Sequence, residues 1–170
     1  MRNWIQELDD ITAEFESHFG GLTEAELNKA DKGWSAGEHI DHLIKVSQSY
    51  YPVLDHLKKH QLNLGFLANI GFIVRMFGNM ILKSVQPDNT QKVRTFPLWE
   101  PSNISADVID QFKAEQDQLK EQIQSCEAFV KAGAVIHSPA NSRIVYKLET
   151  AFDIIVDHQK RHLQSALKAL

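Results

Sequence analysis

Cysteine and proline are scarce in this chain, and their scarcity excludes several classes of protein. The 170 residues include a single cysteine, Cys126, so neither an intrachain disulfide framework nor a cysteine-rich zinc site can be built. With five prolines, no low-complexity tract and 24% charged residues, the composition is typical of a soluble globular protein, so we expect no disorder. Its 43% of hydrophobic residues suffices for a real core, and its length predicts one domain, residues 1–170.

Basic residues are neither in excess nor gathered in one place. Lys and Arg total 18 against 22 acidic residues, and no basic stripe is available to follow a phosphate backbone. We therefore expect no nucleic-acid partner. The opening residues MRNWIQELDD carry acidic side chains where a signal peptide needs an apolar run, so we expect a cytoplasmic protein.

Apolar residues recur at helical spacing in four long segments, which predict four long helices. The first ends at Gly20-Gly21, the second begins with a capping box formed by Ser35 and Glu38, and Pro52 should kink or divide the second. No stretch alternates at period two for long enough to predict a sheet. We therefore expect an all-α four-helix bundle with a long crossover connection. The predicted helices span residues 3–19, 35–60, 105–133 and 143–167.

The most hydrophobic segment, residues 64–85, predicts an extra helix inserted between the second and third bundle helices. Asn69, Arg75 and Asn79 interrupt it, and a charge near mid-bilayer costs about 2.5–3.5 kcal/mol, so we expect no membrane insertion. At about 100° per residue the three polar positions spread too widely for an in-plane membrane anchor. A dimer contact, a lid or a core helix remain, and we prefer the dimer contact, which makes the protein a homodimer.

Residues 86–103 form a long connection with three of the five prolines and no sustained periodicity. Its aromatic residues, Phe96 and Trp99, should pack onto the body of the protein. Connections this long in compact domains often frame a functional site.

Histidine is the residue type that stands out. His158 and His162 lie four residues apart on the inward stripe of the predicted last helix. Such a pair shares one helix face about 5–6 Å apart, so both imidazoles can reach one metal ion. The alternative is that both merely hydrogen-bond to core neighbours, because a buried imidazole needs a partner in any case.

A third ligand would have to come from the second helix, which offers His39 and His42. On a helical wheel His39 lies well inside the apolar arc, while His42 lies at its edge. Spacing alone slightly favours His39.

Two short motifs lie on the second and last predicted helices. The first, W-S-x-x-E-x-x-x-H-L, comprises Trp34, Ser35, Glu38, His42 and Leu43; the second, H-x-x-R-H-L-Q, comprises His158, Arg161, His162, Leu163 and Gln164. Together they resemble the DinB superfamily, and the likeness extends over nearly the whole chain. The resemblance implies a DinB-like four-helix bundle, commonly dimeric, that holds a divalent metal on His42, His158 and His162. The family pattern thus favours His42 over His39 as the third metal ligand. The insertion at residues 64–85 is longer than the simplest members would have.

Three protein ligands leave a coordination position open, as in catalytic rather than structural metal sites. Two reactions on a small molecule suit such a site, namely hydrolysis and transfer of a low-molecular-weight thiol. The resemblance favours thiol transfer, because relatives include bacillithiol- and mycothiol-dependent transferases. The rival interpretation is a non-catalytic dimeric structural or binding bundle whose metal site is vestigial or purely structural.

The ligand set also bears on the metal and on its surroundings. Three imidazoles suit zinc or nickel first, with iron and manganese as alternatives. A metal-bound imidazole usually donates its other N–H to an acceptor, and Glu38, Asp41 and Asp157 are the expected acceptors.

Overall fold

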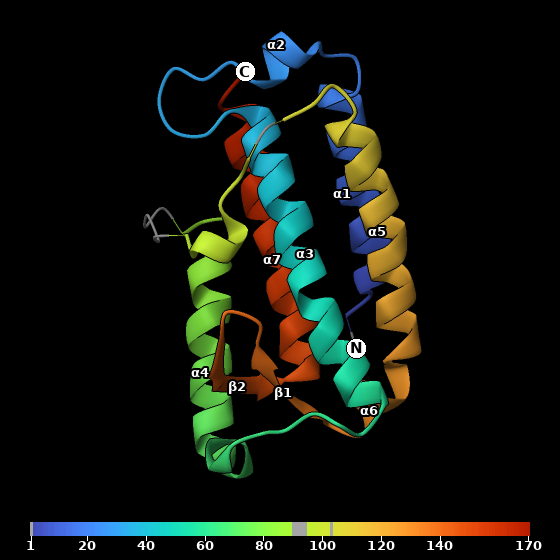
Figure 1. The fold of residues 1–170 in the computed structure, drawn as a ribbon, viewed down its shortest axis with the longest axis vertical. Coiled ribbons are helices and arrows are strands. Elements are labelled where there is room, and N and C mark those ends of the chain that lie inside the picture. Colours follow the sequence, from blue (N-terminus) through green and yellow to red (C-terminus); the bar gives the residue numbers. More distant parts are fainter. Residues whose placement is uncertain (1, 90–94, 103) are drawn as a thin grey trace.

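Helices dominate the computed structural model, which describes residues 2–89, 95–102 and 104–170 (Figure 1). The α-helices are α1 (Trp4–Phe19), α2 (Glu24–Leu27), α3 (Ala36–Lys58), α4 (Gly71–Val85), α5 (Val108–Ser125), α6 (Glu127–Lys131) and α7 (Leu148–Leu167). Two 3₁₀ turns, η1 (Phe66–Asn69) and η2 (Pro97–Trp99), and two strands, β1 (Val135–Ser138) and β2 (Asn141–Lys147), complete the described elements. This mostly helical fold agrees with the predicted class.

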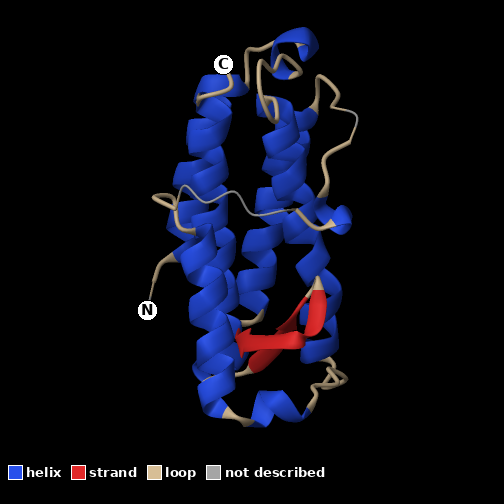
Figure 2. Cartoon of the chain, turned by 90° about the vertical axis from the view of Figure 1, so that its left-hand side faces the viewer, coloured by secondary structure: helices blue, strands red, loops and turns tan. Residues whose placement is uncertain are grey.

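The four longest helices, α1, α3, α5 and α7, run along the length of the molecule around a shared core (Figures 1 and 2). Both α3 and α1 pack against α5 and α7. Helix α1 shows why the sequence folds this way, because its buried residues recur every three or four positions and so form one apolar stripe. They are Trp4, Leu8, Ile11, Phe15 and Phe19.

Helix α3 begins where the sequence predicts. Ser35 Oγ accepts the N–H of Glu38, and the Glu38 carboxylate accepts the N–H of Ser35 at 2.7 Å, so the predicted capping box is confirmed. Of the two predicted effects of Pro52, a kink or a division, the division is wrong, because the helix continues through Pro52 to Lys58. Proline removes one backbone donor, and packing along the rest of this long helix outweighs that loss.

A β-hairpin precedes the last helix, and here the prediction of a helix from residue 143 is wrong. Strands β1 and β2 pair antiparallel, with Ile136 opposite Tyr146, and both side chains are buried. Helix α7 therefore begins only at Leu148. The strands are too short to show a clear period of two, although Ile144, Val145 and Tyr146 favour extended structure.

The predicted helix at residues 105–133 is divided in two. Helix α5 ends at Ser125, and α6 follows after Cys126, whose buried side chain marks the junction. Ser105 precedes α5, and its hydroxyl donates to the Asp107 side chain; among the described residues, no side chain caps the N-terminus of this helix by a hydrogen bond. The predicted end at Gly133 is confirmed, since its φ of 69° is a conformation that favours glycine.

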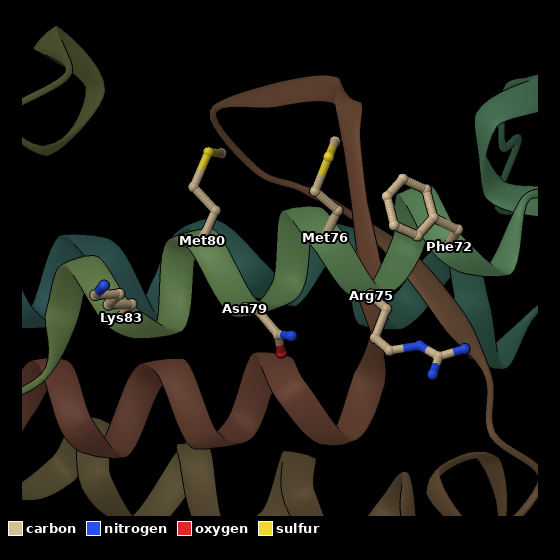
Figure 3. A pocket seen from close by; sticks show the side chains of 6 residues that line it. All are labelled: Phe72, Arg75, Met76, Asn79, Met80 and Lys83. Atoms are coloured by element: carbon tan, nitrogen blue, oxygen red, sulfur yellow. The ribbon is translucent and has the colours of Figure 1, made fainter.

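Helix α4 lies in the segment that the sequence predicts as an extra helix, and it packs on β2 and α7. Its buried Gly78 allows close approach, because an added Cβ would lie 3.1 Å from the Thr150 methyl group. On the opposite side Phe72, Met76 and Met80 point away from α7 into solvent (Figure 3). Within the described residues, no helix combines the length and apolar character needed to cross a bilayer.

Candidate metal centre

Three histidines from two helices meet on one side of the core. His42 comes from α3 and is buried, while His158 and His162 come from α7 and are half-buried. One ring nitrogen from each lies within 4.8 Å of the corresponding atoms of the other two. The structure thus brings together all three residues that the resemblance implies as ligands.

A backbone carbonyl determines which nitrogen of His42 faces the cluster. His42 Nδ1 lies 2.7 Å from the carbonyl oxygen of Trp99. Because a carbonyl only accepts, Nδ1 carries the proton, and a neutral His42 then keeps a free lone pair on Nε2. That Nε2 lies 3.4 Å from Nε2 of His158.

The separation of these two atoms tests whether a metal ion fits. Metal–nitrogen bonds of 2.0–2.1 Å at a tetrahedral angle place two ligand nitrogens about 3.3–3.4 Å apart. The His42–His158 distance of 3.4 Å matches this value. The donor set, three imidazoles with at least one nitrogen already oriented by an outer hydrogen bond, also suits a divalent ion.

The connection that carries Trp99 is attached to α3 by polar contacts on both sides of His42. Trp99 Nε1 donates to Ser49 Oγ at 3.0 Å, Lys45 Nζ donates to the Glu100 carbonyl at 2.9 Å, and the Ser102 N–H donates to Asp41 at 2.9 Å. The expectation that this connection frames the site holds at Trp99, whose carbonyl contacts His42. Residues 90–94 and 103 lie outside the described part.

A fourth histidine and a tryptophan complete the cluster. His39 Nδ1 lies 2.9 Å from His162 Nδ1. The Trp34 ring packs against the rings of His39, His42 and His162, with centroid distances of 5.4, 4.9 and 6.0 Å. The helical wheel placed His39 deeper in the apolar arc than His42, whereas in the structure His42 is buried and His39 only partly so. The ring nitrogen that converges with those of His158 and His162 belongs to His42.

Burial keeps the cluster neutral. It lowers the pKa of His42, brings the pKa of His39 down to about 4, and moves the pKa values of His158 and His162 well below their usual range. A positive charge on a neighbouring imidazole lowers the pKa of His158 and of His162 further. At neutral pH the rings therefore offer lone pairs to a cation, as metal binding requires.

The predicted acidic acceptors have other partners. Glu38 closes the capping box of α3, Asp41 pairs with Lys45 at 2.8 Å, and Asp157 pairs with Arg2 at 2.6 Å. The acceptor for His42 is the Trp99 carbonyl instead. The sequence could not indicate this contact, because every residue has a backbone carbonyl. The contacts of Trp34 with the histidines, in contrast, could be suspected, because Trp34 belongs to the first motif.

Comparison with known proteins gives one result. Neither the curated proteins nor the solved structures contain a significant match to this chain. The model of the DinB superfamily, in contrast, matches residues 7–166, which include every histidine of the cluster. The resemblance seen in the two motifs is thereby confirmed, and the chain belongs to the DinB superfamily.

Proposed function

We propose that this protein binds one divalent metal ion on His42, His158 and His162. The observation that carries the proposal is the 3.4 Å separation of two Nε2 atoms from different helices, which equals the spacing of ligands on one tetrahedral ion. Membership of the DinB superfamily supports it. We also infer that α1, α3, α5 and α7 are the four helices of a DinB-type bundle and that α4 is the inserted helix.

The same geometry supports an enzyme acting on a small molecule, by thiol transfer or hydrolysis. A bound divalent ion supplies Lewis acidity, which lowers the pKa of a water molecule or thiol in an open coordination position. The chain itself contributes orientation, since the Trp99 carbonyl holds the ring of His42. His158 and His162 are only partly buried, so part of each residue faces solvent. Zinc and nickel are the first candidates for the ion, before iron and manganese.

Elemental analysis of protein expressed without a polyhistidine tag tests the site. We expect about one divalent ion per chain, and its loss in both His42→Ala and His158→Ala. The matched control is His56→Ala, which changes an exposed histidine of the same helix, α3, and should keep the ion. A parent protein that stays metal-free after incubation with zinc and nickel would refute the proposal.

Activity separates the enzyme from a structural or binding bundle. The metal-loaded parent is mixed with low-molecular-weight thiols and electrophilic substrates, and with simple esters and amides for hydrolysis. Turnover that disappears in His158→Ala but persists in His56→Ala supports the enzyme. A stoichiometric ion without turnover of any of these substrates, whose removal lowers the thermal midpoint, supports the structural alternative.

We further propose that two copies of the chain pair through α4. The exposed fractions of Phe72, Met76 and Met80 are 72%, 44% and 51%, and together these side chains form an apolar row on one helix. The row lines a shallow hollow of about 400 Å³ that Arg75 and Lys83 border (Figure 3).

The positions in this row favour a second copy over an unrelated partner. If two α4 helices cross antiparallel about a two-fold axis at the level of Gly78, Met76 of one protomer meets Met80 of its partner, because both are two residues from the axis. Arg75 and Lys83 are three and five residues from it, so these like charges do not face each other. The arrangement buries the methionines without opposing the cations.

Sedimentation velocity tests this pairing at micromolar concentration. The parent should sediment as a dimer and Met80→Glu as a monomer with unchanged helical circular dichroism. Gln118→Glu places the same charge on an exposed position of α5 and should remain dimeric. A monomeric parent, or a dimer that tolerates Met80→Glu, would remove α4 as the contact.

A further inference from the structure

His39 stands beside the three proposed ligands without belonging to them. Its ring centroid is 5.0 Å from that of His162, and its Nδ1 lies 2.9 Å from His162 Nδ1. The three nitrogens that converge within 4.8 Å belong to the other histidines of the cluster. The contact between His39 and His162 therefore needs its own explanation.

Distance distinguishes a hydrogen bond from a pair of ligands. Two nitrogens on one tetrahedral ion are about 3.3–3.4 Å apart, whereas an N–H···N hydrogen bond is about 2.9–3.0 Å long. His42 and His158 show the first spacing, at 3.4 Å, and the His39–His162 pair shows the second. A proton therefore lies between His39 and His162.

The position of that proton decides whether His162 can bind a metal through Nε2. If His39 donates it, a neutral His162 must carry its own proton on Nε2, and that atom has no lone pair to offer. If His162 donates from Nδ1, its Nε2 is bare. Only the second arrangement leaves Nε2 available as a ligand.

We propose that His39 is a positioning residue that accepts the Nδ1–H of His162 and so selects the tautomer whose Nε2 binds the metal. This inference rests on the proposed metal function. His162 and His42 would then be oriented in the same way, because the Trp99 carbonyl likewise accepts the Nδ1–H of His42 and leaves its Nε2 free for the metal. The ring of Trp34 packs against the rings of both His39 and His162.

Loss of such an outer contact to a metal-bound imidazole typically lowers metal affinity 10- to 100-fold. We therefore expect His39→Leu to bind zinc 10- to 100-fold more weakly than the parent, still at one ion per chain. His39→Asn should recover most of the affinity, because its side-chain oxygen can replace Nδ1 as acceptor. His56→Leu, an equal change at an exposed position of α3, should leave affinity unchanged.

Two spectroscopic measurements exclude a merely structural role. The cobalt-substituted parent and His39→Asn should have the same absorption spectrum, since the ligands are unchanged. In the zinc-loaded parent, nitrogen-15 NMR should show His162 protonated at Nδ1. A cobalt spectrum that changes in both His39 variants would make His39 a ligand and overturn the proposal, as would zinc affinity in His39→Leu within twofold of the parent.

Failure of the metal proposal can be told apart from failure of this one. If the parent binds no metal, the metal function falls, while the nitrogen-15 spectrum of the metal-free protein still shows which ring of the pair carries the proton. A proton on His39 Nδ1 there would contradict our assignment independently. If the parent binds metal and the His39 variants match it in affinity, only the positioning role falls.

Discussion

The side-chain amides of Gln116 and Gln159 exchange hydrogen bonds in the interior of the protein. Gln116 Nε2 donates to Gln159 Oε1 at 2.7 Å, and Gln159 Nε2 donates back at 3.3 Å. Their exposed fractions are 0% and 2%. Gln159 directly follows His158, so this pair, which joins α5 to α7, also opposes rotation of α7 at the proposed metal site.

Gln116→Leu should therefore destabilise the protein by about 1–3 kcal/mol, because it leaves the amide of Gln159 buried without its partner. The double variant Gln116→Leu/Gln159→Leu should cost less than the sum of the two single changes, since no orphaned amide remains. Urea unfolding of the four proteins measures the coupling. Additive effects would show that the two amides do not depend on each other.

Ser49→Ala should weaken zinc binding severalfold. The change removes the acceptor of Trp99 Nε1 and so loosens the carbonyl that orients His42. Competition with a chromophoric chelator measures the affinity. Ser125→Ala removes an equivalent hydroxyl at the end of α5, far along the chain from the site, and should match the parent. Equal affinities in all three proteins would mean that the connection does not position His42.

Stability at low pH should depend on Glu7. The Arg2 guanidinium hydrogen-bonds to its carboxylate and lowers its pKa to about 2, below the usual 4.3 or so of an unfolded chain. Between these two pKa values Glu7 is protonated in the unfolded state and ionised in the folded state. The contribution of Glu7 to stability is therefore fully present above about pH 4.5 and is lost as the pH falls toward 2.

Glu7→Gln should remove this part of the pH dependence, on the order of 1–2 kcal/mol after solvent screening. Urea unfolding at pH 6 and at pH 2.5 gives the difference. Glu121→Gln, at an exposed position of α5, should keep the slope of the parent. A slope that is the same in both variants would assign the acid sensitivity to other groups.

The helices and the cluster were predictable to the extent that side-chain patterns encode them. Two local signals illustrate this. The capping box of Ser35 and Glu38 is present in the structure. The pair His158 and His162, predicted from its spacing of four residues, lies together with His42. Glu38 shows the limit, because a residue already engaged in capping was also expected beside the metal.

The features that were not predicted from the sequence depend on long-range contacts and on backbone atoms. The β-hairpin depends on pairing between two short strands, of which β2 packs on α4 and β1 on α3, and the sequence of one strand alone does not indicate this pairing. The Trp99 carbonyl reaches His42 from 57 residues away through a backbone atom that every residue possesses. Long-range contacts and backbone groups leave no trace in periodicity, so they required the structure.

Gly37 packs tightly against its surroundings close to the site. It lies in the first turn of α3, two residues before His39, and its hydrogen faces Ile104 and the carbonyl of Leu27. An added Cβ would lie 2.4 Å from Ile104 Cγ2 and 3.1 Å from that carbonyl oxygen. The first distance requires a shift, and neither neighbour is the end of a long flexible side chain.

Gly37→Ala should consequently destabilise the protein by about 1–3 kcal/mol, although alanine is favoured over glycine within a helix by roughly 1 kcal/mol. Gly71→Ala is the matched control, because nothing lies within 4 Å of a Cβ in the first turn of α4, and this variant should be as stable as the parent or more so. Adding Ile104→Ala to Gly37→Ala should cost less than it does in the parent, since it removes the clashing methyl group. Urea midpoints of these proteins decide the matter, and a stabilised Gly37→Ala would show that the loop bearing Ile104 moves aside freely.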